Sequence, residues 1–271
     1  MNDSVLVEKE APLGWLTLNR PEIRNALSLE MIGSIGDALD RVREDSEISV
    51  LIIRANGPVF SAGHDIREMT RKHGNLDELR EIFGKCNKMM LKLHDLPQPV
   101  IAQVHGIATA AGCQLVAACD LAIAEAGARF ATPGVKIGLF CTTPMIPLVR
   151  VIGRRRAMDM LLSGRFVSAE EAMQFGLVNK VVPSEKLAEE TRNWALELAQ
   201  ASPFVLGLGK NAFYSQVDLD ERSAYEYGKE VIAMNCMAED AFEGMSAFVE
   251  KRKPVWKNKA TTSCGPVTAG K

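Results

Sequence analysis

The chain has 271 residues, of which 47% are hydrophobic and 24% charged, and its formal net charge at pH 7 is −2. This composition suits one sizeable globular domain, and the near-neutral charge gives no electrostatic reason to expect a nucleic acid or an anionic membrane as partner. No run approaches the roughly 18 consecutive apolar residues that a membrane-spanning helix needs, so no span is expected.

The N-terminal sequence and the cysteines bear on the compartment. The opening MNDSVLVEKEAPLGWLTLN is acidic and alternating, unlike a basic signal peptide or an Arg-rich transit peptide. The six cysteines include no CxxC pair, and the four histidines no HExxH motif. We therefore expect a cytoplasmic protein with reduced, buried thiols and no metal centre.

The first half of the chain alternates strand and helix patterns. Residues 5–8 and 14–18 alternate around a Pro/Gly turn, which predicts a hairpin. Ser28 is expected to cap a helix with apolar residues at three- and four-residue spacing. The continuous apolar run at 50–53 predicts a strand buried on both faces.

A second strand–loop–helix unit follows. A charged helical segment ends at Leu96, before two prolines, and residues 100–104 predict the next strand. The stretch ATAAGCQLVAACD comes directly after this strand and opens a helix, and residues 121–125 predict a further short strand. Together these units favour an α/β core with parallel strands.

Helices dominate beyond about residue 143. Ser168 and Glu171 form a capping-box pattern, and Gly176 is expected to close that helix. Later helix starts are predicted at Ser184, Pro203 and Asp218. The motif GLGKNA at 207–212 is similar to a dinucleotide-binding loop, but it lies in a helical stretch without a preceding strand, so we reject a nucleotide site there.

The segments SAGHD and TAAGC both follow predicted buried strands. Ligands of open α/β sheets gather at the carboxyl ends of strands, and small residues there let main-chain N–H groups approach a ligand. Two converging N–H donors would form an oxyanion hole. The alternative is that these glycines and alanines only permit tight helix–strand packing.

The chain resembles the crotonase superfamily, the enoyl-CoA hydratase/isomerase family. The resemblance covers nearly the whole chain, in the order LNRPEIRNALS, PVFSAGHDI, PVIAQVHG, AAGCQLVAACDLAIA, FATPGVKIGL, GLVNKVV and AFVEKRKPVW. It implies the ClpP/crotonase-like α/β fold, with a repeated ββα spiral core at residues 1–200. It further implies a C-terminal helical trimerisation part at 201–258, a disordered tail at 259–271, and a homotrimer or a hexamer built as a dimer of trimers.

The resemblance also implies an acyl-CoA substrate whose thioester oxyanion is stabilised by two main-chain N–H groups. Matching the motifs assigns these donors to Ala62 and Ala111. Coenzyme A belongs to the substrate, so no separate cofactor is expected. The residues implied to bind coenzyme A are Arg24, Ala62, Gly63, His64, Asp65, Ile66, Ala111, Phe248 and Lys251, the last from a basic KRK run that a neighbouring subunit could supply.

The chain departs from the family at the two catalytic glutamates of its hydratases, because Gln114 and Gly134 occupy those positions. An amide cannot exchange protons near neutral pH, so Gln114 is expected to bind water or a carbonyl. His64 is the candidate replacement, since an imidazole titrates near neutrality. The methylmalonyl-CoA decarboxylase branch shares this histidine, although its tyrosine matches Cys141 here. Other interpretations make His64 a structural loop residue, Asp65 a helix cap, or the whole chain a catalytically silent acyl-CoA-binding protein.

Overall fold

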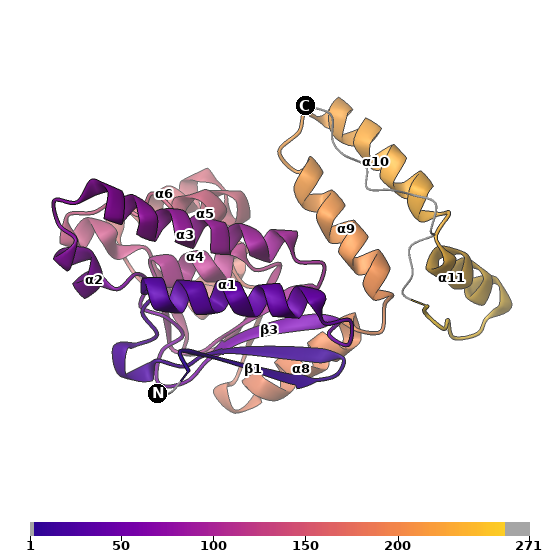
Figure 1. The fold of residues 1–271 in the computed structure, drawn as a ribbon, viewed down its shortest axis with the longest axis horizontal. Helices are drawn as coiled ribbons and strands as arrows, with labels where there is room; N and C mark the ends of the chain where they lie inside the picture. Colours follow the sequence, from indigo (N-terminus) through magenta and orange to yellow (C-terminus); the bar gives the residue numbers. More distant parts are fainter. Residues whose placement is uncertain (1–2, 258–271) are drawn as a thin grey trace.

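A layered α/β core is followed by three C-terminal helices, of which only the first packs against the core, in a computed structural model that describes residues 3–257 (Figure 1). The strands are β1 (Val5–Glu10), β2 (Leu13–Leu18), β3 (Val50–Ala55), β4 (Val100–Val104), β5 (Ile107–Thr109), β6 (Leu121–Glu125), β7 (Arg129–Ala131), β8 (Val167–Ser168) and β9 (Lys180–Val182). The α-helices are α1 (Leu29–Glu44), α2 (Ile66–Arg71), α3 (Leu76–Asp95), α4 (Ala111–Ala118), α5 (Met145–Ile152), α6 (Arg154–Ser163), α7 (Ala169–Phe175), α8 (Leu187–Leu198), α9 (Pro203–Gln216), α10 (Glu221–Asn235) and α11 (Glu239–Glu250). Three short 3₁₀ turns are η1 (Pro21–Ile23), η2 (Pro133–Ile137) and η3 (Ser184–Lys186).

The main sheet has six strands in the order β1-β2-β3-β4-β6-β9. Strands β1 and β2 form the predicted antiparallel hairpin, and every other pairing in this sheet is parallel. A second sheet has the order β5-β7-β8. It was not predicted, because strands of two or three residues are too short to show a period of two.

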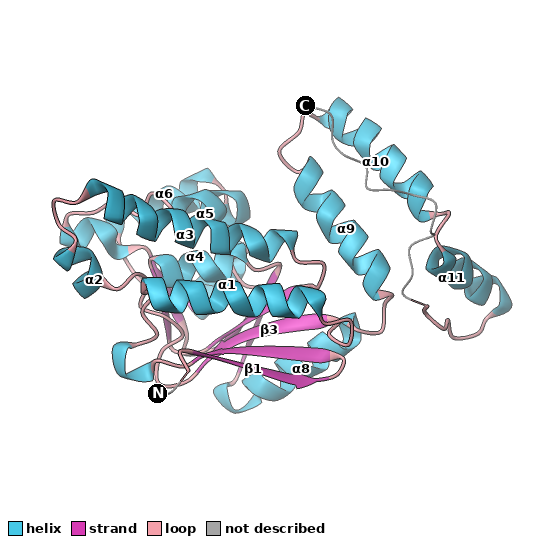
Figure 2. Ribbon diagram, in the orientation of Figure 1, coloured by secondary structure: helices cyan, strands magenta, loops and turns pink. Residues whose placement is uncertain are grey.

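The central strands are buried on both faces, as the continuous apolar run at β3 predicted. Leu51 and Ile53 belong to the large core beneath α1 and α3, whereas Val50 and Ile52 pack on the opposite face with residues of α8. Figure 2 shows the sheet between these two helical layers. Parallel strands covered on both sides fix the loops at their carboxyl ends, where the candidate site lies.

Helix ends follow the sequence signals where the cap is local. Ser28 accepts a hydrogen bond from the Met31 N–H at 3.2 Å, and Ser168 and Glu171 make both bonds of the predicted capping box. A helical segment begins at Ser184 as predicted, although its first three residues form the 3₁₀ turn η3 that leads directly into α8. The predicted start at Asp218 was wrong: the cap of α10 is Asp220, whose carboxylate accepts the Ser223 N–H.

Helices α9, α10 and α11, here called the C-terminal arm, extend away from the core (Figure 1). The arm exposes many large apolar side chains close together, whereas the surface of a monomeric protein rarely exposes a large contiguous apolar patch. They are Phe213, Val217, Leu219, Tyr225, Ile232, Met237, Phe242, Met245, Phe248 and Val249. The boundary predicted at residue 201 stays a prediction, and the predicted disordered tail lies outside the described residues.

The described cysteines are free thiols, and four of the five are buried. Burial raises the pKa of the Cys86 thiol to about 12, which keeps it protonated and unreactive. Cys236 is the exception to the predicted burial, since it is exposed between α10 and α11. Within residues 3–257, no helix is long and apolar enough to cross a membrane.

Candidate active site

The two small-residue loops meet at the carboxyl ends of β3 and β4. Ser61 and Ala108 form an isolated parallel bridge, in which the Ser61 N–H donates to the Ile107 carbonyl at 3.1 Å. The Thr109 N–H donates in turn to the Ser61 carbonyl at 2.9 Å. The two segments are therefore held together by main-chain hydrogen bonds.

Two glycines permit this approach. A Cβ atom on Gly63 would lie 2.8 Å from the Thr109 oxygen and 3.0 Å from the Ala111 nitrogen, and Gly63 has a φ of +87°. A Cβ on Gly112 would lie 2.4 Å from the Ser61 oxygen. Side chains at these positions would separate the loops. The glycines therefore do permit tight packing between the two loops. This packing does not by itself say what the main-chain N–H groups of the loops bind.

The hydrogen bonds of the first loop correct the assignment of Ala62 as an oxyanion donor. The Ala62 N–H already donates to the Arg24 carbonyl at 3.0 Å, and the Gly63 N–H donates to the Ser61 hydroxyl at 3.2 Å. At His64 the chain forms a parallel bridge with Leu27, a pairing that turns the His64 N–H away from Leu27. No acceptor for that N–H is found among the described residues, so His64 carries the free donor of this loop.

The second candidate donor is Ala111, the first residue of α4. Its N–H cannot bond within the helix, and α4 has no side-chain cap at this end. The preceding Ala110 has a φ of 50° and donates its own N–H to the Ala131 carbonyl at 2.9 Å. This unusual backbone leaves the Ala111 N–H, with the positive end of the helix dipole, beside the Gly63–His64 peptide.

Gln114 lies one turn into α4 and is 3% exposed. Its Oε1 atom is buried without a hydrogen-bond partner among the described residues. A buried, unpaired amide oxygen costs about 1–3 kcal/mol, so a retained one calls for an occupant such as water or a ligand. Gln114 thus fits a binding role without proton transfer.

Gly134 is packed against the turn that follows it. A Cβ atom on Gly134 would lie 2.9 Å from the Cys141 Sγ and 3.0 Å from the Leu139 oxygen. Cys141 is 8% exposed, and burial raises the pKa of its thiol. The room that a longer side chain at this position would need is therefore filled by residues 139–141.

Thr132 is a buried polar residue that the sequence did not single out. It is fully buried, and its hydroxyl has no hydrogen-bond partner within the described residues. It directly follows Ala131, whose carbonyl holds Ala110 at the start of α4. A threonine at the end of a short strand carries no local signal of function, because threonine is common in strands.

The His64 ring is partly buried and neutral at pH 7. Burial lowers the pKa of His64 to about 4, and the ring makes an edge-on contact with Phe83 of α3, with 5.1 Å between centroids. Its Nε2 atom is buried without a partner among the described residues. A neutral imidazole in a dry setting can offer one hydrogen bond, but it is not an imidazolium acid at neutral pH.

The neighbours of His64 have structural roles. The Asp65 carboxylate accepts the Arg67 and Glu68 N–H groups and caps α2, as expected in one of its two interpretations. Ile66 begins α2 and is 48% exposed, so it is accessible at the rim of the loop. Arg24 has an exposed side chain, while its carbonyl holds the Ala62 N–H.

Phe248 and Lys251 are not brought to the loops within one chain. Both lie at the end of α11, while α2 lies at the opposite end of the molecule (Figure 1). Phe248 is 85% exposed. Arg252, in the middle of the basic run, is paired with Glu243 and Glu250, so its charge is largely compensated.

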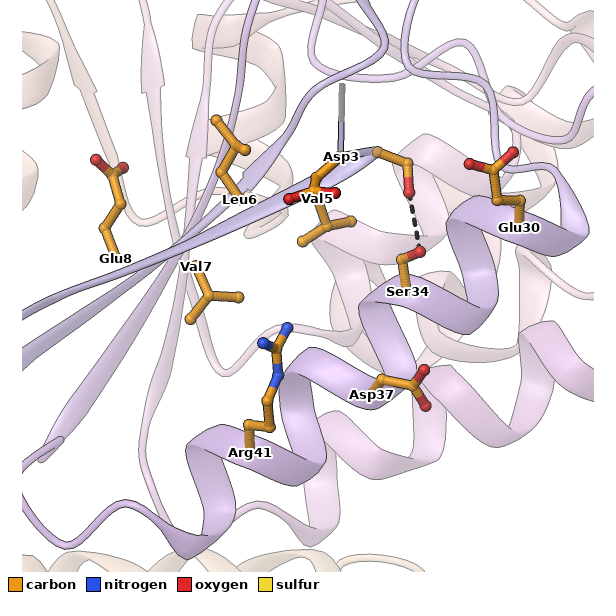
Figure 3. Close-up of a pocket in the computed structure, with 10 residues that line it drawn as sticks. Asp3, Val5, Leu6, Val7, Glu8, Glu30, Ser34, Asp37 and Arg41 are labelled. Atoms are coloured by element: carbon orange, nitrogen blue, oxygen red, sulfur yellow. Dashed lines mark hydrogen bonds between the residues drawn. The ribbon is translucent and has the colours of Figure 1, made fainter. Parts of the chain in front are cut away.

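A surface hollow of about 640 Å³ lies between β1 and α1 (Figure 3). Four of its lining residues are acidic and one is basic, Arg41. None of its lining residues comes from the two loops, and its negative charge would repel the phosphates of coenzyme A. The hollow is therefore separate from the candidate site.

Within residues 3–257, no group of three or more histidine, cysteine and acidic side chains is placed to hold a metal ion.

Comparison with known proteins identifies the family. Residues 8–259 match the family model described as enoyl-CoA hydratase/isomerase. The chain is 46% identical over 251 residues to the enoyl-CoA hydratase domain-containing protein 3, mitochondrial, of Xenopus laevis, covering 93% of this chain and 85% of the relative. It is 45% identical over 244 residues to the human protein of that name, covering 90% of this chain and 80% of the relative.

Solved structures agree with this assignment. A crystal structure of an enoyl-CoA hydratase from Mycobacterium smegmatis superposes with a TM-score of 0.91 at 44% identity, covering 93% of this chain and 98% of that one. The crystal structure of human enoyl-CoA hydratase domain-containing protein 3 gives 0.90 at 43% identity, covering 93% and 100%. The chain belongs to the enoyl-CoA hydratase/isomerase family and has the crotonase fold, as the motifs predicted.

The cytoplasmic location predicted from the sequence is contradicted by these relatives, because the vertebrate proteins at 44–46% identity are named as mitochondrial.

Proposed function

We propose that the chain is an acyl-CoA enzyme that stabilises a thioester oxyanion between the main-chain N–H groups of His64 and Ala111. The observation that carries the proposal is the pairing of two unbonded N–H groups across loops joined by hydrogen bonds. Removal of one donor from such a pair typically lowers the catalytic rate by about 10²–10³-fold. No cofactor beyond the coenzyme A of the substrate is proposed.

The side chains nearest these donors constrain the chemistry. Gln114 and Gly134 cannot exchange protons near pH 7, and His64 is neutral there. General acid–base catalysis typically raises a rate by about 10²–10⁴-fold. This site has no pair of carboxylates at these two positions, so it cannot add water by that mechanism. We propose that Gln114 and the His64 ring bind and orient the acyl group or a water without carrying its proton.

Decarboxylation is the second candidate, favoured by the neutral His64 ring, whose Nε2 atom is buried without a partner among the described residues. In a methylmalonyl-type thioester the bond between the α-carbon and the carboxylate breaks and carbon dioxide leaves. The electron pair moves into an enolate whose oxygen accepts hydrogen bonds from the two N–H groups. Water then protonates the α-carbon, and the hydroxide that remains combines with the released carbon dioxide as bicarbonate. This route needs an oxyanion hole and no catalytic carboxylate.

Mass spectrometry of an acyl-CoA panel tests both candidates. The panel contains short and medium enoyl-CoAs, methylmalonyl-CoA and malonyl-CoA, incubated with and without EDTA. A gain of water identifies a hydratase, and a loss of carbon dioxide identifies a decarboxylase. Bound but unchanged thioesters would show a silent acyl-CoA-binding protein and refute catalysis.

An Ala111→Pro variant tests the donor, because proline removes this N–H at the first position of the helix, although its ring also adds atoms on the side that faces Gly63. We expect turnover to fall by about 10²–10³, since one oxyanion donor is lost. Glu221→Pro makes the same change at the exposed first turn of α10 and serves as the control. Equal activities in the two variants, with circular dichroism confirming both folds, would refute the role of Ala111.

We also propose a homotrimer, or a hexamer made of two trimers. The exposed apolar face of the C-terminal arm supports this assembly, since a second copy would bury it. The distance of Phe248 and Lys251 from the loops of their own chain is consistent with a role at a neighbouring site. Light scattering at micromolar concentration tests the proposal, and a monomer would refute it.

A further inference from the structure

The GLGKNA motif has a use that its sequence did not reveal. It lies in α9, the first helix of the C-terminal arm, where a Cβ atom on Gly207 would come within 2.9 Å of Pro97. One turn later, Lys210 extends its side chain into the core and is only 7% exposed. The glycine thus permits close docking of α9, and the lysine crosses the interface.

The Lys210 ammonium group pairs with the Asp120 carboxylate, which is only 16% exposed and contacts three elements. The Asp120 Oδ2 atom accepts Lys210 Nζ at 2.6 Å and the Val100 N–H at 2.7 Å. Its Oδ1 atom accepts the Tyr214 hydroxyl at 2.9 Å. Lys210 donates additionally to the Gln98 carbonyl at 2.9 Å. Asp120 therefore links α9 both to the start of β4 and to the junction between α4 and β6.

His94 of α3 completes the cluster, here called the Asp120 network (His94, Asp120, Lys210 and Tyr214). Its ring stacks on Tyr214 with 3.9 Å between the ring centroids. Burial lowers the pKa of Lys210, and the charge of Asp120 opposes this change. A buried pair whose bonding groups are satisfied has one well-defined geometry, and removing a partner leaves an uncompensated charge.

The network lies at one end of α4, and the candidate oxyanion site lies at the other. Helix α4 runs from Ala111 to Ala118, a span of about 12 Å, and all eight of its residues are buried. Asp120 follows the C-cap Cys119 directly. A short helix in close-packed surroundings shifts as a unit, so displacement at Asp120 is transmitted to the Ala111 N–H and to Gln114.

We propose that the Asp120 network couples docking of the C-terminal arm to the position of α4, which makes Asp120, Lys210 and Tyr214 positioning residues for the thioester site. This inference rests on the proposed function, since it requires an acyl-CoA at Ala111. Coupling of binding sites is reciprocal, so a thioester bound at the loops must stabilise the docked arm by as much as the arm stabilises binding.

Hydrogen–deuterium exchange of the full chain, with and without saturating butyryl-CoA, measures this coupling. Butyryl-CoA is saturated and has no carboxylate to lose, so it reports binding alone. In the wild type we expect protection both at residues 108–118 and at 203–216. Tyr214→Phe removes one hydroxyl and keeps the ring on His94. We expect it to abolish the protection at 203–216 and to raise the butyryl-CoA Kd at least about 5-fold, the lower end of typical coupling.

Tyr225→Phe is the matched control, because it also removes a single tyrosine hydroxyl, from α10 and outside the Asp120 network. It should behave as the wild type. Protection of the wild type at 108–118 without protection at 203–216 would overturn the coupling and leave the proposed function intact. The same holds if Tyr214→Phe lowers only the melting temperature, because a merely structural role does not alter ligand-dependent protection. No butyryl-CoA binding by the wild type would overturn the proposed function and the inference together.

Discussion

Replacement of Gly134 by alanine tests whether residues 139–141 fill the space beside this position. The added Cβ would lie 2.9 Å from the Cys141 Sγ and 3.0 Å from the Leu139 oxygen, both shorter than ordinary van der Waals contact. Overpacking of this kind costs about 1–3 kcal/mol in the free energy of unfolding. At about 2–4 °C per kcal/mol for a chain of this size, we expect the melting temperature to fall by several degrees.

A double-mutant cycle with Cys141→Ala separates the two contacts. Removal of the sulfur relieves the 2.9 Å contact but leaves the backbone contact with Leu139, so the cycle should show a favourable coupling of about 1 kcal/mol. Urea unfolding followed by circular dichroism supplies the four free energies. A Gly134→Ala variant within about 0.5 kcal/mol of the wild type would refute the reasoning, since that is the usual range for a surface change.

The same contacts bear on any attempt to restore an acid at this position. A glutamate at position 134 must displace residues 139–141 before its carboxylate can reach the site. We therefore expect Gly134→Glu, alone or with Gln114→Glu, to destabilise the chain without producing hydratase activity in the enoyl-CoA assay.

Three further changes have defined outcomes. Burial lowers the pKa of His64 from 6.5 to about 4 in the folded chain. Between these two pH values the unfolded chain binds a proton at His64 that the folded chain does not, so the free energy of unfolding decreases as pH falls from about 6.5 to about 4. His64→Gln should remove this contribution, at most about 3 kcal/mol, when urea unfolding is compared at pH 7 and near pH 4. Gln114→Glu places a carboxyl where Oε1 has no described partner, so the pKa of the new group should be raised. The free energy of unfolding of the variant should therefore decrease relative to that of the wild type as pH rises from 5 to 8, by about 1.4 kcal/mol for each unit by which the pKa is raised. A difference between the two proteins that does not change with pH would contradict the burial argument. Ser168→Ala removes the capping box of α7 and should cost about 1 kcal/mol in thermal unfolding, whereas no loss would mean that the cap is dispensable.

The sequence by itself determined the features that neighbouring residues encode. The continuous apolar run of β3 predicted a strand buried on both faces, because each of its side chains needs an apolar environment whichever way it points. Ser28 and Ser168 predicted helix starts because a cap involves residues only three positions apart. The motifs along the chain predicted the family, and SAGHD and TAAGC predicted a site at the strand ends.

Only the tertiary structure decided which groups are free to act. Ala62 was assigned as a donor, but its N–H is taken by the carbonyl of Arg24, a residue 38 positions away, and His64 is left as the free donor. Similarly, no local pattern joins Asp120 to Lys210, or Gly134 to Cys141. Hydrogen bonds and close contacts of this kind depend on where the fold brings distant segments together, whereas sequence patterns report the environment of each segment alone. The chemistry of this site is set by those long-range pairings.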